Sequence, residues 1–268
     1  MAYREYGHKD GQLVVYFHGA PGAMEECAVF DRYAKAHNLH IVCFDRFALD
    51  SSLTREDYFH HLATQIDNMA GGKQVDIIGF SIGTYIALEV AALLKEQVRQ
   101  IHLISCVAPL YSGDFLDHMA GGLVFKLAMQ KPSIFSILTQ FQSMIARLAP
   151  SMLVNMLFST AAGKDKELIQ QNDFKTHITG VLKQCFKHRA KGYIRDITYY
   201  VEWHEAKEYI ASIQLWHGTE DNWSPPSMAD SLAHIIPSHV SIEKMEGLSH
   251  YSCLYEAAPK ICAQLTKG

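Results

Sequence analysis

The sequence predicts an α/β protein, in which a largely parallel β-sheet carries helices on both faces and is interrupted by one helical insertion. Over residues 1–109, apolar strand-like runs alternate with helical patterns, which is typical of such sheets. Over residues 110–207, apolar residues recur at helical spacing without a strand pattern. Strand patterns return in residues 208–268. We therefore expect one core domain formed by residues 1–109 and 208–268, with residues 110–207 inserted as a helical cap.

The elements of the core follow from apolar runs separated by turn-forming residues. An opening hairpin is expected around residues 9–12. The expected strands are 13–17, 39–44, 75–79, 101–106, one that starts at 212, and 240–245, and the expected helices are 25–37, 54–69 and 85–94.

The insertion is expected to follow the sixth strand and to precede the strand that begins at residue 212. An exposed turn is expected within it at residues 161–166. Its charge-free stretches are shorter than the roughly 18–20 apolar residues that a membrane span needs, so no stable membrane insertion is expected. The expected cap helices are 123–129, 134–145 and 152–158.

One serine, Ser81, lies between Gly79 and Gly83 at the point where an apolar strand gives way to a helix-forming run. So sharp a turn strains the serine backbone, and side chains two residues to either side would collide, so both flanks need glycine. The serine hydroxyl is then presented at the helix N-terminus, beside the N–H of Ile82. A Gly-x-Ser-x-Gly string alone is often only a turn, but the flanking strand and helix favour a nucleophile elbow.

A serine hydroxyl needs a histidine to accept its proton and a carboxylate to orient that histidine. Asp221 follows the strand that begins at residue 212, and His250 follows the strand 240–245, so the order is serine, acid, histidine. Glu220 is the alternative acid, and either carboxylate would otherwise be a turn or N-cap residue. His250 taken alone would be one surface histidine among 15, and its position after Asp221 is what favours it.

The loop after the strand 13–17 can supply the second donor of an oxyanion hole. Its sequence, His18 to Gly22, lets the backbone fold tightly enough to aim an N–H group at the serine. By position, the N–H of Ala20 would act with that of Ile82. His18 is expected to brace this loop, and the alternative is that the loop is ordinary Gly/Pro turn chemistry.

Together, these motifs resemble the α/β-hydrolase superfamily, in its serine-nucleophile branch with a helical cap. The resemblance implies the fold and the triad but not the substrate, because esterases, thioesterases, carbon–carbon bond hydrolases and some peptidases share the motifs. Two departures are Phe47 to Ser52, where the family commonly has Pro-Gly-x-Gly-x-Ser, and Thr84, where it often has glycine. The motifs that carry the resemblance are 18–22, 45–46, 79–83, 218–221 and 247–250.

The expected activity is hydrolysis of a carboxylic ester or thioester with an apolar acyl group, through an acyl-enzyme on Ser81. Carbon–carbon bond hydrolysis and aminopeptidase action are alternatives of the same fold. An aminopeptidase would need carboxylates for the substrate amine, which Glu202, Glu205 and Glu208 could supply, although a solvated helix face explains them better. A further alternative is a non-catalytic ligand-binding protein of this fold.

Methionines are frequent in the expected cap and can line an adaptable apolar pocket for an acyl group or a ring. Ordinary helix packing explains them equally well, and both interpretations stay open. These methionines are Met119, Met129, Met144, Met152 and Met156.

Charge and composition exclude several other function classes. A net charge of −4 and the lack of a Lys/Arg cluster argue against nucleic-acid binding. The start has neither a cationic leader nor an apolar signal core, so a cytoplasmic protein is expected. No metal or cofactor is expected, because no histidine or cysteine group has ligand spacing. The six cysteines are expected to be reduced thiols in the core, and the oligomeric state stays open.

Overall fold

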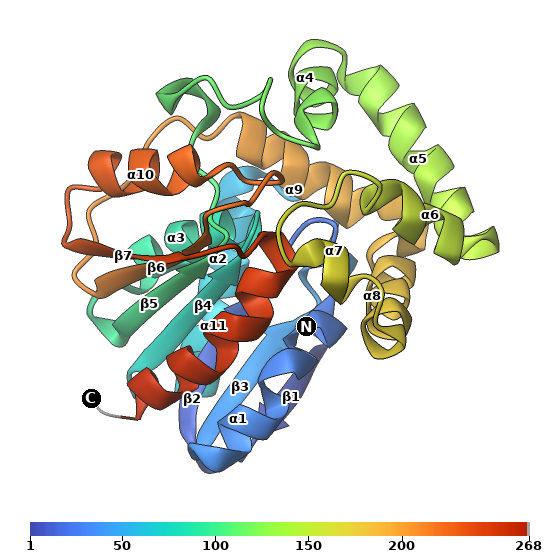
Figure 1. Cartoon of the computed structure of the whole chain (residues 1–268). Helices are drawn as coiled ribbons and strands as arrows, with labels where there is room; N and C mark the ends of the chain where they lie inside the picture. The colour runs from blue at the N-terminus through green and yellow to red at the C-terminus, as the bar shows by residue number, and fades with distance from the viewer. Residues whose placement is uncertain (267–268) are drawn as a thin grey trace.

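The computed structural model describes residues 1–266 and every side chain among them except that of His188. Seven strands form one sheet in the order β1-β3-β2-β4-β5-β6-β7. Strand β1 is antiparallel to β3, and the other neighbours are parallel (Figure 1). The strands are β1 (Tyr3–Gly7), β2 (Gln12–Phe17), β3 (Leu39–Phe44), β4 (Val75–Phe80), β5 (Val98–Ile104), β6 (Ser212–Gly218) and β7 (Val240–Met245).

Helices cover both faces of the sheet, with α1 and α11 on one face and α2 and α3 on the other (Figure 1). The helices of the core are α1 (Asp31–Ala36), α2 (Arg55–Ala70), α3 (Gly83–Leu94), α10 (Pro226–Ile235) and α11 (His250–Leu265). This arrangement confirms the α/β fold with a mostly parallel sheet.

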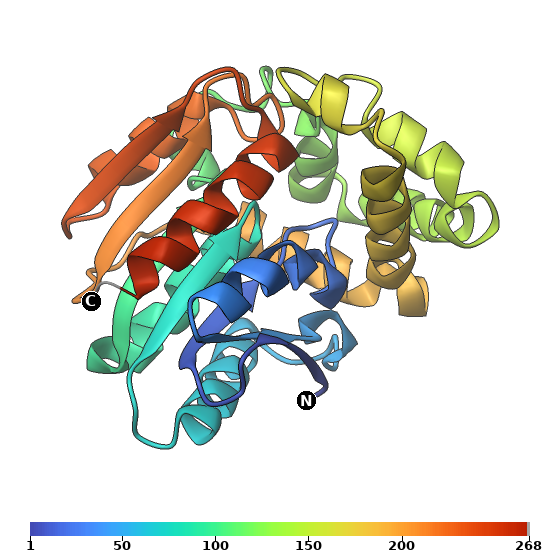
Figure 2. The same ribbon diagram turned by 60° about the horizontal axis from the view of Figure 1, so that its bottom comes forward.

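The insertion lies between β5 and β6 and contributes helices but no strand in the described residues. It covers the edge of the sheet at which the parallel strands end, and it sits to one side of the core in both views (Figures 1 and 2). The helices are α4 (Gly122–Gln130), α5 (Pro132–Leu148), α6 (Pro150–Leu157), α7 (Asp165–Leu168), α8 (Asn172–Cys185) and α9 (Lys191–Val201).

The expected opening hairpin is wrong. Strand β1 pairs with β3, with Tyr3 opposite Phe44, and does not pair with β2. The reason is that β2 has parallel partners on both sides, β3 and β4, so the free edge available to β1 is that of β3.

Two further expectations need correction. The expected helix 25–37 is divided into a 3₁₀ helix, Met24–Phe30, and the short α1. The strand before the insertion is the fifth and not the sixth, because the segment before β2 forms a single strand.

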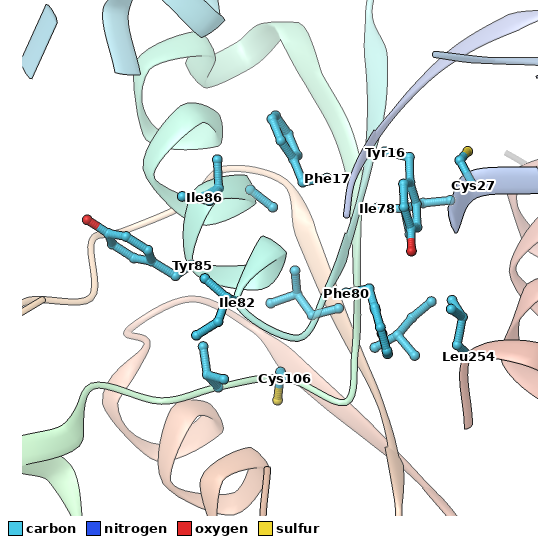
Figure 3. Packing of buried hydrophobic residues seen from close by; sticks show 14 of the residues in the cluster. Tyr16, Phe17, Cys27, Ile78, Phe80, Ile82, Tyr85, Ile86, Cys106 and Leu254 are labelled. Carbon is cyan, nitrogen blue, oxygen red and sulfur yellow. The ribbon is translucent and has the colours of Figure 1, made fainter. Parts of the chain in front are cut away.

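The central strand β4 is buried along its whole length, and its neighbours pack the core on both faces. Figure 3 shows Phe80 at its end, with Ile82 and Tyr85 leading into α3. All six cysteines are buried and unpaired, which confirms the expected core thiols, and burial raises the pKa of each. Among the residues described, no helix is both long and apolar enough to span a bilayer.

Candidate active site

Ser81 occupies a strained position between β4 and α3. Its φ is +55°, in the left-handed region that residues other than glycine rarely adopt, and the residue is only 8% exposed. A Cβ at Gly79 would lie 2.8 Å from the Cα of Thr84, and one at Gly83 would lie 2.1 Å from the carbonyl oxygen of Phe17. Both flanks of the turn therefore need glycine for lack of space.

Thr84, one of the two departures from the family pattern, stabilises this turn. Its hydroxyl donates to the carbonyl of Ser81 at 2.7 Å and accepts from the N–H of Val107 at 3.1 Å. The side chain is fully buried, so both bonds are shielded from water. Thr84 thus connects the serine turn to the loop that follows β5.

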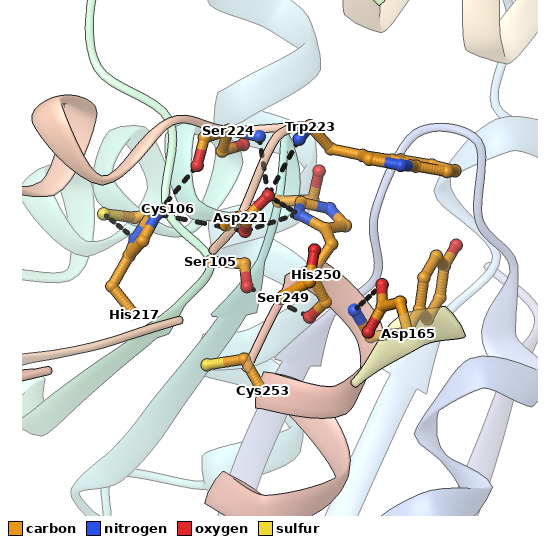
Figure 4. A network of polar contacts seen from close by, with 12 residues as sticks. Ser105, Cys106, Asp165, His217, Asp221, Trp223, Ser224, Ser249, His250 and Cys253 are labelled. Atoms are coloured by element: carbon orange, nitrogen blue, oxygen red, sulfur yellow. Dashed lines mark hydrogen bonds and ion pairs between the residues drawn. The ribbon is translucent and has the colours of Figure 1, made fainter. Parts of the chain in front are cut away.

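Asp221 and His250 form a buried pair at the carboxyl ends of β6 and β7. The Nδ1 of His250 lies 2.8 Å and 3.1 Å from the two carboxylate oxygens of Asp221 (Figure 4). The N–H groups of Trp223 and Ser224 also donate to this carboxylate, each at 2.9 Å. Burial alone would raise the pKa of Asp221, but His250 and the N–H of Ser224 help to hold it below its usual value. The neighbouring Glu220 is exposed, so the chain turns Asp221 toward the histidine.

A second histidine, His217, lies on the other side of Asp221, 3.9 Å from its carboxylate. The Nε2 of His217 bonds to the carbonyl of Ser224 at 2.8 Å, and its Nδ1 is 3.6 Å from the sulfur of Cys106 (Figure 4). Burial lowers the pKa of His217, which favours the neutral ring. His217 therefore helps to hold Asp221 in place, a role that the sequence did not predict.

The imidazole of His250 is held between aromatic rings. It stacks on Trp223 at a centroid distance of 5.2 Å and contacts Phe80 at 4.8 Å. Its main-chain carbonyl accepts a bond from the Ser105 hydroxyl at 3.1 Å. Within the described part of the chain, no hydrogen bond joins the Ser81 hydroxyl to His250, so that link belongs to the proposal below.

A cavity of about 210 Å³ opens beside Ser81, between the core and the insertion. Two of the five cap methionines, Met119 and Met156, line it, whereas Met129, Met144 and Met152 are exposed elsewhere. Its lining is mostly apolar and consists of Ala20, Pro21, Ser81, Ile82, Val107, Met119, Ala120, Gly121, Val124, Phe125, Met156, Leu157, Ser159, Thr160, Tyr193, Trp223 and Ser224.

The three glutamates considered for binding an amine do not line this cavity. Glu202 instead pairs with Arg55 at 2.7 Å, on the surface. Glu205 and Glu208 follow it in the segment that returns to the core, and both are exposed. The described residues therefore place no carboxylate of this group beside Ser81.

Ala20 and Ile82 both line this cavity, and the backbone N–H of neither residue donates to an acceptor among the described residues. The loop that carries Ala20 is held at Gly19, whose N–H donates to Glu26 at 2.8 Å and whose carbonyl accepts from Arg46 at 3.2 Å. Two free N–H groups on a fixed backbone are what an oxyanion hole requires.

Buried side chains brace this loop from below. The Nδ1 of His18 bonds to the carbonyl of Gly19 at 2.8 Å, and burial holds the pKa of His18 well below its usual value. The hydroxyl of Tyr16 donates to Glu26 at 2.8 Å. Burial also raises the pKa of Glu26 to about 7. The structure therefore places His18 in the expected bracing position and adds Glu26, which no sequence motif marks.

A buried ion-pair group connects this loop to the insertion. Arg46, which follows β3, contacts Asp196 of α9 at 2.7 Å, and Arg195 contacts the other carboxylate oxygen at 2.9 Å. All three side chains are at most 5% exposed, so none of these charges is solvated. Arg195 also donates to the main-chain carbonyl of Arg46 at 2.8 Å.

The expectation of an exposed turn at 161–166 holds only in part: the chain turns at 163–164 and Lys164 and Lys166 are exposed, but helix α7 begins at Asp165. Asp165 is buried, and its carboxylate accepts bonds from the N–H groups of Tyr251 and Ser252 at 3.0 Å and 2.6 Å. These two N–H groups lie in the first turn of α11, directly after His250. The cause is that α7 packs against α11, a contact between distant segments that local turn composition does not reveal.

The family model described as lipid-droplet associated hydrolase matches residues 49–253 of the chain. This span contains Ser81, Asp221 and His250 and covers most of the sequence. No curated protein matches the chain.

Solved structures share the fold at low sequence identity. A thermophilic esterase from Thermogutta terrifontis matches with a TM-score of 0.69 and 14% identity, over 99% of this chain and 91% of its own. The enol-lactonase from Burkholderia xenovorans matches with a TM-score of 0.67 and 13% identity, over 99% and 95%. A bromoperoxidase from Bacillus anthracis matches with a TM-score of 0.65 and 16% identity, over 98% and 93%. These similarities establish the α/β-hydrolase fold.

Proposed function

Because this chain belongs to the lipid-droplet associated hydrolase family, we propose that it hydrolyses a carboxylic ester or thioester with an apolar acyl group through an acyl-enzyme on Ser81. The observation that carries the proposal is the buried Asp221–His250 pair, which stands with the strained Ser81 at one edge of the sheet, beside an apolar cavity. A hydrolase needs an activated nucleophile, and these three residue types supply one.

In the first half of the reaction, the Ser81 hydroxyl attacks the carbonyl carbon while His250 takes its proton. Asp221 keeps the proton on Nδ1, which leaves Nε2 of His250 free to act as the base. The negative oxygen of the tetrahedral intermediate accepts bonds from the N–H groups of Ala20 and Ile82. The C–O or C–S bond then breaks, and His250 gives its proton to the leaving group.

In the second half, water replaces the alcohol or thiol. His250 takes a proton from this water as it attacks the acyl carbon, and the bond to Ser81 breaks with return of the proton to the serine oxygen. The products are a carboxylic acid and the regenerated enzyme. No cofactor takes part in this scheme.

The cavity and the family support the proposed substrate class. Met119, Val124 and Met156 give the cavity apolar walls without a charged side chain among its lining residues. The family description names lipid droplets, and we extend the proposal to esters of the lipid kind. The cytoplasmic location expected from the sequence stays a prediction.

Replacement of Ser81 by alanine tests the proposal. Ser81→Ala removes the nucleophile and should lower kcat/KM for p-nitrophenyl esters by about 10⁴–10⁶-fold. Ser159→Ala is the matched control, because Ser159 lines the same cavity and loses the same hydroxyl, and it should keep wild-type activity. Both proteins should show the wild-type circular dichroism spectrum.

Other results would overturn the assignment. A folded Ser81→Ala protein that retains more than about a tenth of the activity would exclude Ser81 as nucleophile. Wild-type protein that binds esters but releases no alcohol burst would favour the ligand-binding alternative. Turnover confined to free-amine peptides or to diketones would favour the aminopeptidase or the carbon–carbon bond hydrolase.

A further inference from the structure

The helices α4, α5 and α6 expose an unusual amount of apolar surface. Ten of the thirteen large apolar side chains that are exposed in the described structure lie on these three helices. We call these ten residues the outer face. They are Leu123, Met129, Ile134, Ile137, Leu138, Phe141, Met144, Leu148, Met152 and Met156.

Helix α5 shows that the outer face is a second apolar face and not a loosely packed core. Phe135 and Ala146 are buried and hold the helix to the rest of the insertion. On the other side, six residues at spacings of three and four form a stripe along the whole helix, and each is at least 44% exposed. These six are Ile134, Ile137, Leu138, Phe141, Met144 and Leu148.

The segment that carries the outer face has formal charges of one sign only. Residues 118–163 contain no Asp or Glu and three basic residues, Lys126, Lys131 and Arg147, in a chain of net charge −4. Lys126 pairs with Asp117, whereas Lys131 and Arg147 are exposed and form no ion pair with any described residue. Apolar side chains between cations match a surface of acyl chains beneath anionic head groups.

The outer face is continuous with the cavity beside Ser81. Met156 belongs to both, and Val124 lines the cavity from the helix that carries Leu123 and Met129. Figure 1 places α4 and α5 along the outer edge of the insertion, away from the sheet. An acyl chain at this face can therefore reach the cavity without crossing a charged surface.

We propose that the outer face docks on a phospholipid-covered lipid surface with anionic head groups and that the cavity takes its substrate from that surface. This inference deepens the proposed function by naming the surface and orientation through which the enzyme meets its substrate. The helices lie in the interface and do not span it.

Flotation with vesicles of phosphatidylcholine and phosphatidylserine tests the docking. The variant Ile137→Gln/Phe141→Gln/Leu148→Gln removes three apolar side chains that do not line the cavity, and its vesicle-bound fraction should fall by roughly tenfold or more. The matched control is Tyr111→Gln/Ile210→Gln, which removes exposed apolar side chains outside the outer face and should float as wild type does. All three proteins should hydrolyse a soluble short-chain ester equally.

Three results would overturn the docking. They are wild-type protein that does not float, a triple variant that floats as well as wild type, and a control that loses as much binding as the triple variant. A dimer that the triple variant dissociates, seen by light scattering without vesicle binding, would assign the face to a second copy instead. Ser81→Ala should float normally, so a failure of the proposed function leaves this result readable.

A different observation supports a second inference, concerning how His250 is positioned. Three contacts fix this residue: Asp221 holds its ring, Ser105 holds its carbonyl, and Asp165 holds the two N–H groups that follow it. The first two come from the core, but Asp165 comes from the insertion. We infer that Asp165 is a positioning residue for His250, acting through the first turn of α11.

The geometry at the start of α11 explains why an outside carboxylate is needed. Ser249 and Ser252 form a capping box at this helix start, in which the N–H of Ser249 donates to the Ser252 hydroxyl at 2.8 Å. Without Asp165, the N–H of Tyr251 would stay unpaired in a buried site, and that of Ser252 would have only the Ser249 hydroxyl as acceptor. A negative charge also suits a helix N-terminus.

The test compares Asp165→Asn with Thr54→Ala, since Thr54 caps the distant helix α2 by a bond to the N–H of Asp57 at 3.1 Å. This inference rests on the proposed function. Both variants should lower the melting temperature. Only Asp165→Asn should lower kcat for a soluble ester, by roughly tenfold or more, with KM within about twofold of wild type, because it displaces His250 without touching the cavity.

Three outcomes decide this inference. A folded Asp165→Asn enzyme with wild-type kcat, or one whose loss lies in KM, would overturn it. If Asp165→Asn does not fold, Asp165→Glu is used in its place, because this change keeps the charge but shifts its position. A wild-type kcat in Asp165→Glu would also overturn the inference. Activity that survives in Ser81→Ala overturns the proposed function instead, so the two failures are distinguishable.

Discussion

The core buries its apolar side chains, whereas the insertion exposes many of its own. Strand β4 is buried along its whole length, and buried hydrogen bonds fix the loops that carry Gly19 and Asp221. Helix α5 of the insertion buries one side and exposes the other. The core is built to hold a few groups in one geometry, whereas the insertion offers a surface. Under the proposed function, chemistry and substrate access thus belong to different regions of one chain.

The two regions nevertheless meet through buried charges. Asp196 of α9 contacts Arg46 beside the loop of Ala20, and Asp165 of α7 contacts the start of α11 beside His250. The first contact reaches Gly19, the neighbour of Ala20, through a bond from Arg46, and the second ends one and two residues after His250. A change in the insertion is therefore expected to alter both the proposed oxyanion site and His250.

The largest effect is expected in the core, at the acid. Asp221→Asn should lower kcat by about 10⁴-fold, because only a carboxylate keeps His250 in the tautomer that accepts the serine proton. Glu220→Gln is the matched control, since Glu220 is exposed and adjacent, and it should change little. Equal losses in the two variants, measured by steady-state kinetics, would contradict the assignment of Asp221.

The next effect tests the junction at α9. Asp196→Asn leaves Arg46 and Arg195 buried without their partner and should lower the free energy of unfolding by about 3–5 kcal/mol. Asp230→Asn breaks an exposed pair with Lys244 and should change it by less than about 1 kcal/mol. Urea denaturation measures both. A small effect at Asp196 would mean that the insertion and core are not coupled there.

A third prediction concerns pH and the loop of Ala20. The pKa of Glu26 in the folded state, about 7, lies above the value of 4.5 for an unperturbed glutamate. The folded state therefore binds the Glu26 proton more tightly than the unfolded state does. The stability that this proton contributes is fully present below pH 4.5 and is lost as the pH rises through about 7.

Comparison with Glu26→Gln isolates this contribution. The variant cannot ionise at this position. Between pH 4.5 and pH 8, its free energy of unfolding should therefore rise relative to that of wild type by up to about 3 kcal/mol. Parallel pH profiles for the two proteins in urea denaturation would show that Glu26 does not titrate in this range.

The smallest effect concerns the cavity wall that the insertion supplies. Each methylene buried there should gain about 0.8 kcal/mol, so kcat/KM for p-nitrophenyl esters should rise about fourfold per carbon from acetate until the cavity is full. Val124→Phe narrows the wall and should move the best substrate to a shorter ester. A flat series, or one that falls steadily toward decanoate, would leave the insertion without a role in specificity.

The sequence predicted those features of the candidate site whose positions are set by local structure. The turn at Ser81 follows from two glycines within five residues, and the order of Asp221 and His250 follows from strands that end at one edge. It missed Glu26, Arg46 with Asp196, and Asp165, because these contacts join segments far apart in the chain and have no spacing rule. The opening hairpin failed for the same reason, since the partner of β1 depends on which sheet edge is free.

The bonds from Asp165 to the start of α11 also restrict how this fold can be recombined. The last helix of the core depends on an acceptor that the insertion brings, 86 residues earlier in the chain. A chimera that joins this core to a foreign insertion would leave the buried N–H of Tyr251 without a partner, directly after His250, and would remove an acceptor from that of Ser252. Core and insertion of this chain are therefore exchangeable only as a matched pair, or when the incoming insertion carries a carboxylate at the same point.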